Sequence, residues 1–147
     1  MSANVLPTNN TTLVRTALRG VVAGLAGGVV FGIIMGVQNM LPMVGMLIGQ
    51  ENAAIGFVVH MLISALIGAT FGVIASRLPS GWAPQVIAGG VYGIVWWVLG
   101  ALVLMPLLLG MSAMVFVIGD MQIMSLIGHV LFGMVMGAAF KLLAGRI

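Results

Sequence analysis

Hydrophobic residues gather in four long segments, which are separated by short stretches richer in polar residues or proline. The segments cover residues 16–41, 52–78, 84–105 and 121–144. Each is long enough to cross a bilayer as an α-helix, which takes about 20 apolar residues. The pattern therefore predicts an all-α membrane protein with four transmembrane helices, preceded by a polar N-terminal tail over residues 1–15.

Prolines and acidic residues mark the predicted helix ends. We expect Pro42 to close the first helix, because the residue before a proline disfavours the helical conformation. Pro84 suits the first turn of the third helix. Glu51 and Asp120 precede the second and fourth helices, where a carboxylate is favoured by the positive end of the helix dipole. A short linker over residues 79–83 then joins the second helix to the third.

The second half of the chain repeats the first. The stretch HMLISALIGATFGVIASRL, which begins at His60, aligns without a gap with HVLFGMVMGAAFKLLAGRI, which begins at His129. Two tandem helical hairpins, residues 16–78 and 84–147, are therefore predicted. An even number of spans keeps both copies in one orientation, so the repeat is parallel about an axis along the membrane normal.

Glycines recur at every fourth position in the predicted helices. In lipid no hydrophobic force drives helices together, so close backbone approach along small residues is what holds them. We expect these helix-packing positions to face other helices: Gly24, Gly28, Gly32, Gly36, Gly68, Gly72, Gly133 and Gly137.

Composition agrees with a membrane location. The chain is 62% hydrophobic and only 5% charged, against about a quarter charged residues in soluble domains. Cysteine is absent, which excludes disulfides and thiolate sites. The five basic residues form no cluster, so we expect no nucleic-acid partner. They all fall on one side of a four-span topology, and the positive-inside rule then places both termini in the cytoplasm, with the chain in the inner (plasma) membrane.

One apolar segment carries a histidine followed by small residues, VVHMLISALIGATFGV. In this respect the chain resembles small uncharacterised four-helix integral membrane proteins of bacteria and archaea, with a duplicated two-helix repeat that contains histidine. The resemblance covers most of the chain. It implies the four-helix fold and no particular activity.

His60 and His129 are the main candidates for a ligand or metal site. Each lies about two turns inside the outer end of its helix, and an ionisable residue at membrane depth indicates function by default. Two facing imidazoles could bind haem b iron axially, coordinate a metal ion or relay protons. The alternative is structural, with each neutral ring hydrogen-bonded to a neighbouring helix. Both interpretations stay open.

Methionines and acidic residues are secondary candidates. Thioethers suit copper(I), although methionine is also an adaptable apolar filler. The candidate methionines near the predicted outer surface are Met40, Met43, Met46, Met111 and Met114, and the pair Met121 and Met124 has the same spacing of three. Glu51 and Asp120 could form an acidic mouth that attracts cations, or they could be helix-start carboxylates in contact with water.

No enzyme signature is found. Ser64 lies one turn from His60, but its repeat partner is Gly133, and no acidic residue falls inside the predicted bundle to complete a triad. The chain has no phosphate loop and no dinucleotide fingerprint. We therefore expect a protein without catalytic activity.

Three functions follow as hypotheses. The leading one is a compact accessory or assembly subunit of a membrane complex, whose partners are the lipid bilayer and other membrane subunits or a second copy of itself. The second is a small transporter or channel for a metal ion or protons that uses His60 and His129. The third is an electron-transfer protein with haem b bound between the two histidines.

Overall fold

The computed structural model describes residues 10–147, and in this part of the chain the regular structure is entirely helical. Four helical stretches are long and apolar enough to cross a membrane, which confirms the prediction of an all-α chain with four candidate spans. Three of them are single helices, α1 (Asn10–Val37), α3 (Ala53–Ala75) and α6 (Asp120–Leu142). The predicted polar tail falls partly outside the described residues, and its residues 10–15 belong to α1.

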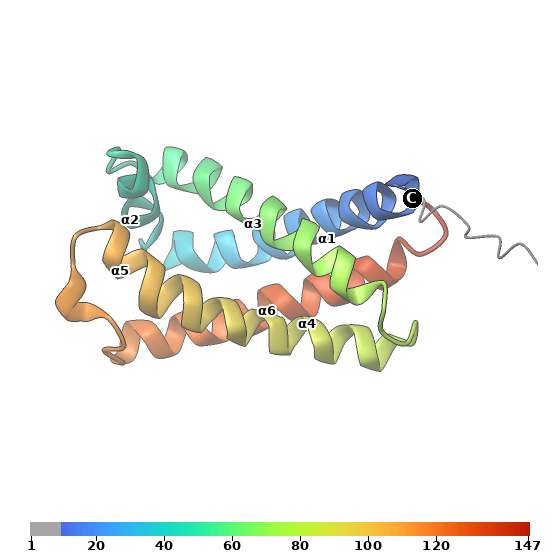
Figure 1. Cartoon of the computed structure of the whole chain (residues 1–147). Helices are drawn as coiled ribbons and strands as arrows, with labels where there is room; N and C mark the ends of the chain where they lie inside the picture. The colour runs from blue at the N-terminus through green and yellow to red at the C-terminus, as the bar shows by residue number, and fades with distance from the viewer. Residues whose placement is uncertain (1–9) are drawn as a thin grey trace, which may run out of the picture.

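The remaining candidate span, Trp82–Leu108, is composite. It consists of α4 (Trp82–Trp96), the π-helical segment η2 (Trp97–Leu104) and α5 (Met105–Leu108). Short helices also occupy the connections at the same end of the bundle. These are α2 (Leu41–Gly45), η1 (Met46–Ile48) and η3 (Ser112–Met114) (Figure 1).

The predicted helix ends need correction. The first helix ends at Val37 and not at Leu41, because the chain turns at Asn39, whose φ of 55° is left-handed. Pro42 does not close this helix but lies in the first turn of α2, where its missing N–H costs no hydrogen bond. Pro106 occupies the same position in α5, so the third span continues past the predicted end at Met105. The second and fourth helices end two to three residues earlier than predicted, at Ala75 and Leu142.

Glycines bring α1 into contact with α3 and α4 into contact with α6, and we call each of these two helix pairs a hairpin. We call the line of close glycine contacts within each pair a glycine seam. A Cβ atom added at Gly24 of α1 would lie 2.7 Å from the Cα atom of Gly68 in α3, and the reverse substitution gives the same distance. In the second hairpin, Gly89 of α4 faces Gly133 of α6 in a similar way. Gly36 differs, because its added Cβ would meet only a side-chain methyl of Leu41 at 3.6 Å. The helix-packing role predicted for Gly36 is therefore not observed.

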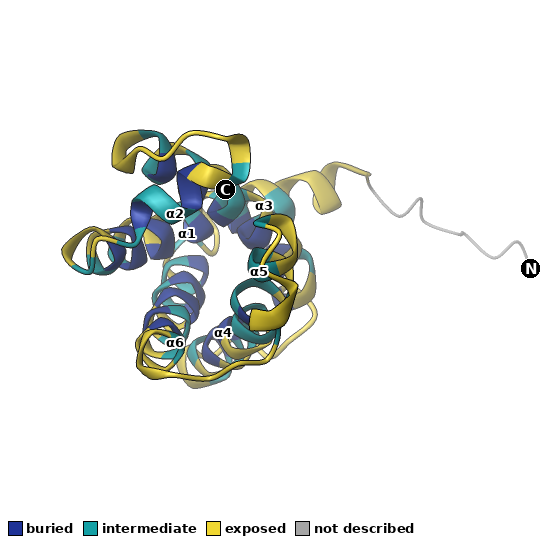
Figure 2. Ribbon diagram, turned by 90° about the vertical axis from the view of Figure 1, so that its left-hand side faces the viewer, coloured by how far each residue is buried: buried dark blue, intermediate teal, exposed yellow. Residues whose placement is uncertain are grey.

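The two hairpins are joined mainly through α1 and α6. Phe132 of α6 fits against Gly27 of α1, and Phe31 of α1 fits against Gly128 of α6, so each large ring fills the space beside a glycine. On the opposite side, α3 and α4 make few contacts. A hydrogen bond of 2.7 Å between the hydroxyls of Thr70 and Tyr92 lies there. The bundle is therefore tightly joined on one side and loosely on the other. Figure 2 looks along the bundle, with α1 and α6 on one side and α3 and α4 on the other.

The two ends of the bundle differ in charge. We call the end that carries the first turns of α1 and the last turn of α6 the basic end, since Arg15, Arg77 and Lys141 lie there. The other end carries α2 and α5 together with Glu51 and Asp120, and we call it the acidic end.

Aromatic and methionine side chains fill the half of the bundle near the basic end. Phe71 of α3 packs edge-on against Phe140 of α6, with ring centroids 5.8 Å apart. Phe71, Phe140 and Met136 are no more than 1% exposed. We refer to these three residues as the aromatic plug. It closes the centre of the bundle between the two ends.

Two glycines of one helix allow a matched test of the packing. We expect Gly24→Ala to lower the thermal stability of the detergent-solubilised protein, because its methyl group would overlap the backbone of Gly68. Overpacking of this kind costs about 1–3 kcal/mol. Gly36→Ala adds the same methyl group further along α1, where its nearest neighbour is a methyl group of Leu41 at 3.6 Å. This variant should leave the unfolding midpoint nearly unchanged. Equal midpoints for the two variants would show that the glycine seam does not hold the hairpin together.

Candidate functional site

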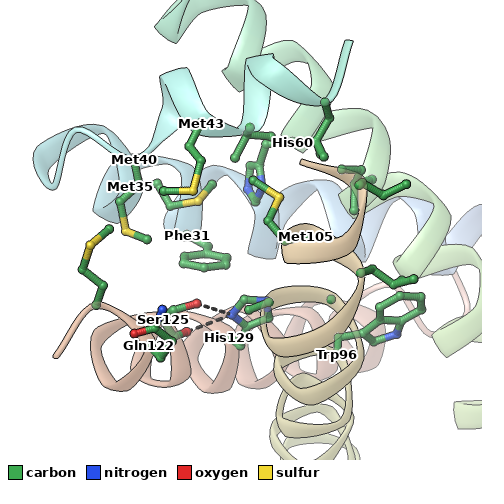
Figure 3. Close-up of a pocket in the computed structure, with 18 of the residues that line it drawn as sticks. Phe31, Met35, Met40, Met43, His60, Trp96, Met105, Gln122, Ser125 and His129 are labelled. Atoms are coloured by element: carbon green, nitrogen blue, oxygen red, sulfur yellow. Dashed lines mark hydrogen bonds between the residues drawn. The ribbon is translucent and has the colours of Figure 1, made fainter. Parts of the chain in front are cut away.

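A cavity of about 360 Å³ lies between the two hairpins, in the half of the bundle near the acidic end (Figure 3). All four candidate spans and the short helix α2 contribute to its wall. It exists because α1 and α6 pack closely while α3 and α4 make few contacts. Most of its lining is apolar, and the polar side chains that line it are His60, Gln122, Ser125 and His129.

His60 reaches the cavity from α3 and bonds across the first hairpin. Its Nε2 atom lies 2.9 Å from the carbonyl oxygen of Gly28 in α1, and the ring is buried. A carbonyl only accepts, so the neutral ring carries its proton on Nε2 and leaves Nδ1 as an acceptor. The hydroxyl of Ser64 donates to the backbone oxygen of His60 at 2.8 Å. The close approach of α1 and α3 at glycine is what makes the first of these bonds possible.

His129 reaches the cavity from α6, but its hydrogen bonds stay within that helix. Its Nδ1 atom lies 2.8 Å from the backbone oxygen of Ser125 and 3.3 Å from the Ser125 hydroxyl (Figure 3). The proton of the neutral ring is therefore on Nδ1, and Nε2 is left as the acceptor. The two histidines thus have equivalent positions in the aligned sequence but opposite tautomers.

Phe31 lies between the two imidazole rings. Its centroid is 5.5 Å from that of His60 and 4.7 Å from that of His129, and both contacts are edge-to-face (Figure 3). Phe31 was not among the residues predicted for the site, although it lies one turn beyond Gly27 and Gly28 on the buried face of α1. Its position means that the histidines line one cavity without facing each other directly.

Only some of the candidate methionines reach this cavity. Met40 and Met43 line it, whereas Met46, Met111 and Met114 are exposed and lie outside its lining. Three further methionines also line it, namely Met35, Met105 and Met121. Met35 follows the predicted packing positions Gly28 and Gly32 by seven and three residues, and this helical spacing was a signal that could have identified it.

The acidic candidates lie away from the histidines. Glu51 and Asp120 are exposed at the acidic end and do not line the cavity. Asp120 is the first residue of α6, and Asn52, next to Glu51, caps α3 by accepting from the backbone N–H of Ile55 at 3.1 Å. In residues 10–147 no group of three or more His, Cys, Asp or Glu side chains could hold a metal ion.

The π-helical segment η2 forms the wall opposite α1. Gly100, Ala101 and Leu104 line the cavity from it, and the indole N–H of Trp97 donates to the backbone oxygen of Gln122 at 2.9 Å. π-Helical turns inside α-helices are frequently found at functional sites. Hydrophobic periodicity predicts only a continuous helix here, so this part of the site was missed.

A family model matches residues 14–147, which is almost the whole chain. The chain belongs to the family of unknown function DUF6789. No curated protein and no solved structure matches it. The cavity and its side chains are therefore the features of this chain that bear on its function.

The tautomers of this DUF6789 protein can be measured directly. At a pH where both rings are neutral, ¹⁵N chemical shifts of labelled histidines should show one ring protonated on Nε2 and one on Nδ1, because each bonds a carbonyl through a different nitrogen. His60→Leu should remove the Nε2–H signals and leave the Nδ1–H signals in place. Identical tautomers for the two rings would contradict this geometry.

Proposed function

We propose that this chain is a non-catalytic membrane protein that binds one apolar molecule from the bilayer in the central cavity, and that it does so as an accessory or assembly subunit. The observation that carries the proposal is a cavity of about 360 Å³ with a mostly apolar lining, which lies between the two hairpins. Ligand sites are typically concave and apolar with a few polar groups that fix orientation. Because this cavity lies between candidate membrane-spanning helices, the bilayer is the natural source of its ligand.

The few polar atoms indicate what the ligand carries. In the neutral rings, His60 keeps an acceptor on Nδ1 and His129 keeps one on Nε2. An apolar chain or ring that bears a hydroxyl or N–H donor would complement these acceptors. A charged headgroup would not, because burying an unpaired charge in such a lining is costly.

We further propose that the two hairpins are a tandem parallel repeat. Their seams support this: an added Cβ would lie 3.1 Å from the backbone nitrogen of Gly68 when placed at Gly24, and 3.1 Å from that of Gly137 when placed at Gly89. Gly68 and Gly137 are paired in the aligned sequence. The positive-inside rule favours a cytoplasmic basic end, and a reporter fused after Ile147 would test this orientation.

Conduction of ions is a weaker hypothesis. The aromatic plug fills the centre of the bundle between the cavity and the basic end, and it offers no polar group to a passing ion. Binding of haem b by the two histidines is also disfavoured, because the Phe31 ring occupies the space between them.

Binding of a soft metal ion is the second candidate function. Five thioether side chains and two imidazoles line the same cavity, and this is the ligand chemistry that suits copper(I). The methionines are Met35, Met40, Met43, Met105 and Met121.

A brominated long-chain alcohol tests the leading proposal, since bromine quenches tryptophan and Trp96 lines the cavity. In a Trp82→Phe/Trp97→Phe background, Trp96 is the remaining tryptophan. We expect saturable quenching by the alcohol and competition by the unbrominated alcohol. The corresponding alkyl bromide, which lacks the hydroxyl donor, should bind more weakly.

Two alanines of the third span provide the matched variants. Ala101→Phe should abolish the saturable component because it fills the cavity, whereas Ala83→Phe, at an exposed position, should not. Quenching that rises linearly with the alcohol and is equal in both variants would mean that the bromine reaches Trp96 only from the surrounding lipid. That result would overturn the proposal.

Silver(I), a stable substitute for copper(I), tests the second candidate. If the thioethers bind a soft ion, calorimetric titration should give a saturable site that Met43→Leu or Met105→Leu weakens by roughly tenfold or more. Met111→Leu and Met114→Leu remove exposed thioethers outside the cavity and should have no effect. If all four variants bind alike, the methionines of the cavity are apolar packing residues.

A further inference from the structure

A second cavity, of about 460 Å³, opens at the basic end of the bundle. Its wall combines the first turns of α1, the end of α3 with the turn that follows it, and the last turns of α6. The aromatic plug separates it from the central cavity, because Phe71 and Phe140 pack against each other between the two. Phe140 and Ala75 contribute to its apolar floor.

Three of the five basic residues of the chain line this cavity, namely Arg19, Arg77 and Lys141. Both acidic side chains, Glu51 and Asp120, lie at the other end of the bundle. Within residues 10–147 the structure contains no ion pair for any of the three cations. Their charges therefore add up at one place, at the end of the bundle where candidate spans begin and end.

Arg19 is held in position before any ligand arrives. Its Nε atom donates to the backbone oxygen of Phe140 at 2.6 Å, and its guanidinium carbon lies 3.7 Å from the centroid of the Phe140 ring. Stacking and this hydrogen bond fix the plane of the guanidinium and leave its two terminal amino groups as donors. A fixed guanidinium matches the geometry of a phosphate group, which it can bind through two parallel hydrogen bonds.

Gln85 supplies a second, independent indication of a ligand. Its amide nitrogen donates to the backbone oxygens of Ala75 and Pro79, at 3.0 and 3.1 Å, which fixes the orientation of the amide. Its Oε1 atom is buried and has no hydrogen-bond partner among the described residues. The side chain lines the cavity and is 2% exposed. A buried acceptor without a donor is costly, and a hydroxyl group of a ligand would satisfy it.

We propose that this cavity binds the headgroup of an anionic phospholipid, with its phosphate on Arg19, Arg77 and Lys141 and a headgroup hydroxyl directed toward Gln85. The apolar floor suits the carbon atoms next to the phosphate. Basic residues near a membrane surface attract the headgroups of anionic lipids. A phosphate carried by a soluble molecule has the same chemistry, so the experiment has to separate the two sources.

Native mass spectrometry of the full chain in detergent, titrated with phosphatidylglycerol or phosphatidylcholine, measures this binding. We expect the protein to retain phosphatidylglycerol preferentially. Arg77→Gln/Lys141→Gln should weaken its binding by roughly tenfold or more. These two side chains make no hydrogen bond within residues 10–147, so their loss should not impair folding. Arg15→Gln/Arg146→Gln removes the same charge at the same end but outside the cavity lining, and should bind like the wild type.

Arg19→Lys separates geometry from charge. It keeps the net charge but replaces the planar guanidinium with an ammonium group. We expect it to weaken binding of phosphatidylglycerol as well. Equal weakening by the two double variants would reveal nonspecific attraction to the basic end and overturn the proposal. Binding of inorganic phosphate that depends on Arg77 and Lys141 and is not displaced by phosphatidylglycerol would also overturn it, in favour of a soluble ligand.

Discussion

Close backbone contact at glycine is the constraint on which the rest of this structure depends. Lipid is as apolar as the side chains, so hydrophobic burial of one helix against another adds no stability. Close packing has to supply that stability. The seam between Gly24 and Gly68 leaves no room for even a methyl group. It brings α1 and α3 close enough for His60 to bond the Gly28 carbonyl. The hydrogen bond of His60 thus depends on the close packing of α1 against α3.

The same constraint explains why the bundle is not filled. Glycine seams make each hairpin a compact pair, and the ring-against-glycine contacts of Phe31 and Phe132 then join α1 to α6. No comparable set of small residues joins α3 to α4, which make few contacts. Side chains near the basic end are large enough to close the centre there. Toward the acidic end the widened η2 segment carries Gly100 and Ala101, and an apolar cavity remains.

Much of the fold could be predicted from the sequence, because its hydrophobic and glycine patterns are strong and periodic. Glycine spacing predicted the seams, and hydrophobic length predicted the spans. The ends were less accessible, since a proline signals a break without saying whether it ends one helix or begins the next, as Pro42 does. The position of Phe31 between the histidines depends on how α1 meets α6. That contact joins residues about one hundred positions apart, and a single sequence carries no local signal for it.

The chemistry of the two cavities argues for binding and against passage. A pathway for ions would need polar groups or water at every level, because an ion without partners is expensive in hydrocarbon. Here the acceptors of His60 and His129 and the cations of Arg19 and Lys141 lie on opposite sides of the aromatic plug. Phe71, Met136 and Phe140 are among the most buried residues of the chain, and opening a route through them would break the packing that holds α6 to its neighbours. Each cavity is therefore better suited to hold a molecule than to pass one on to the other.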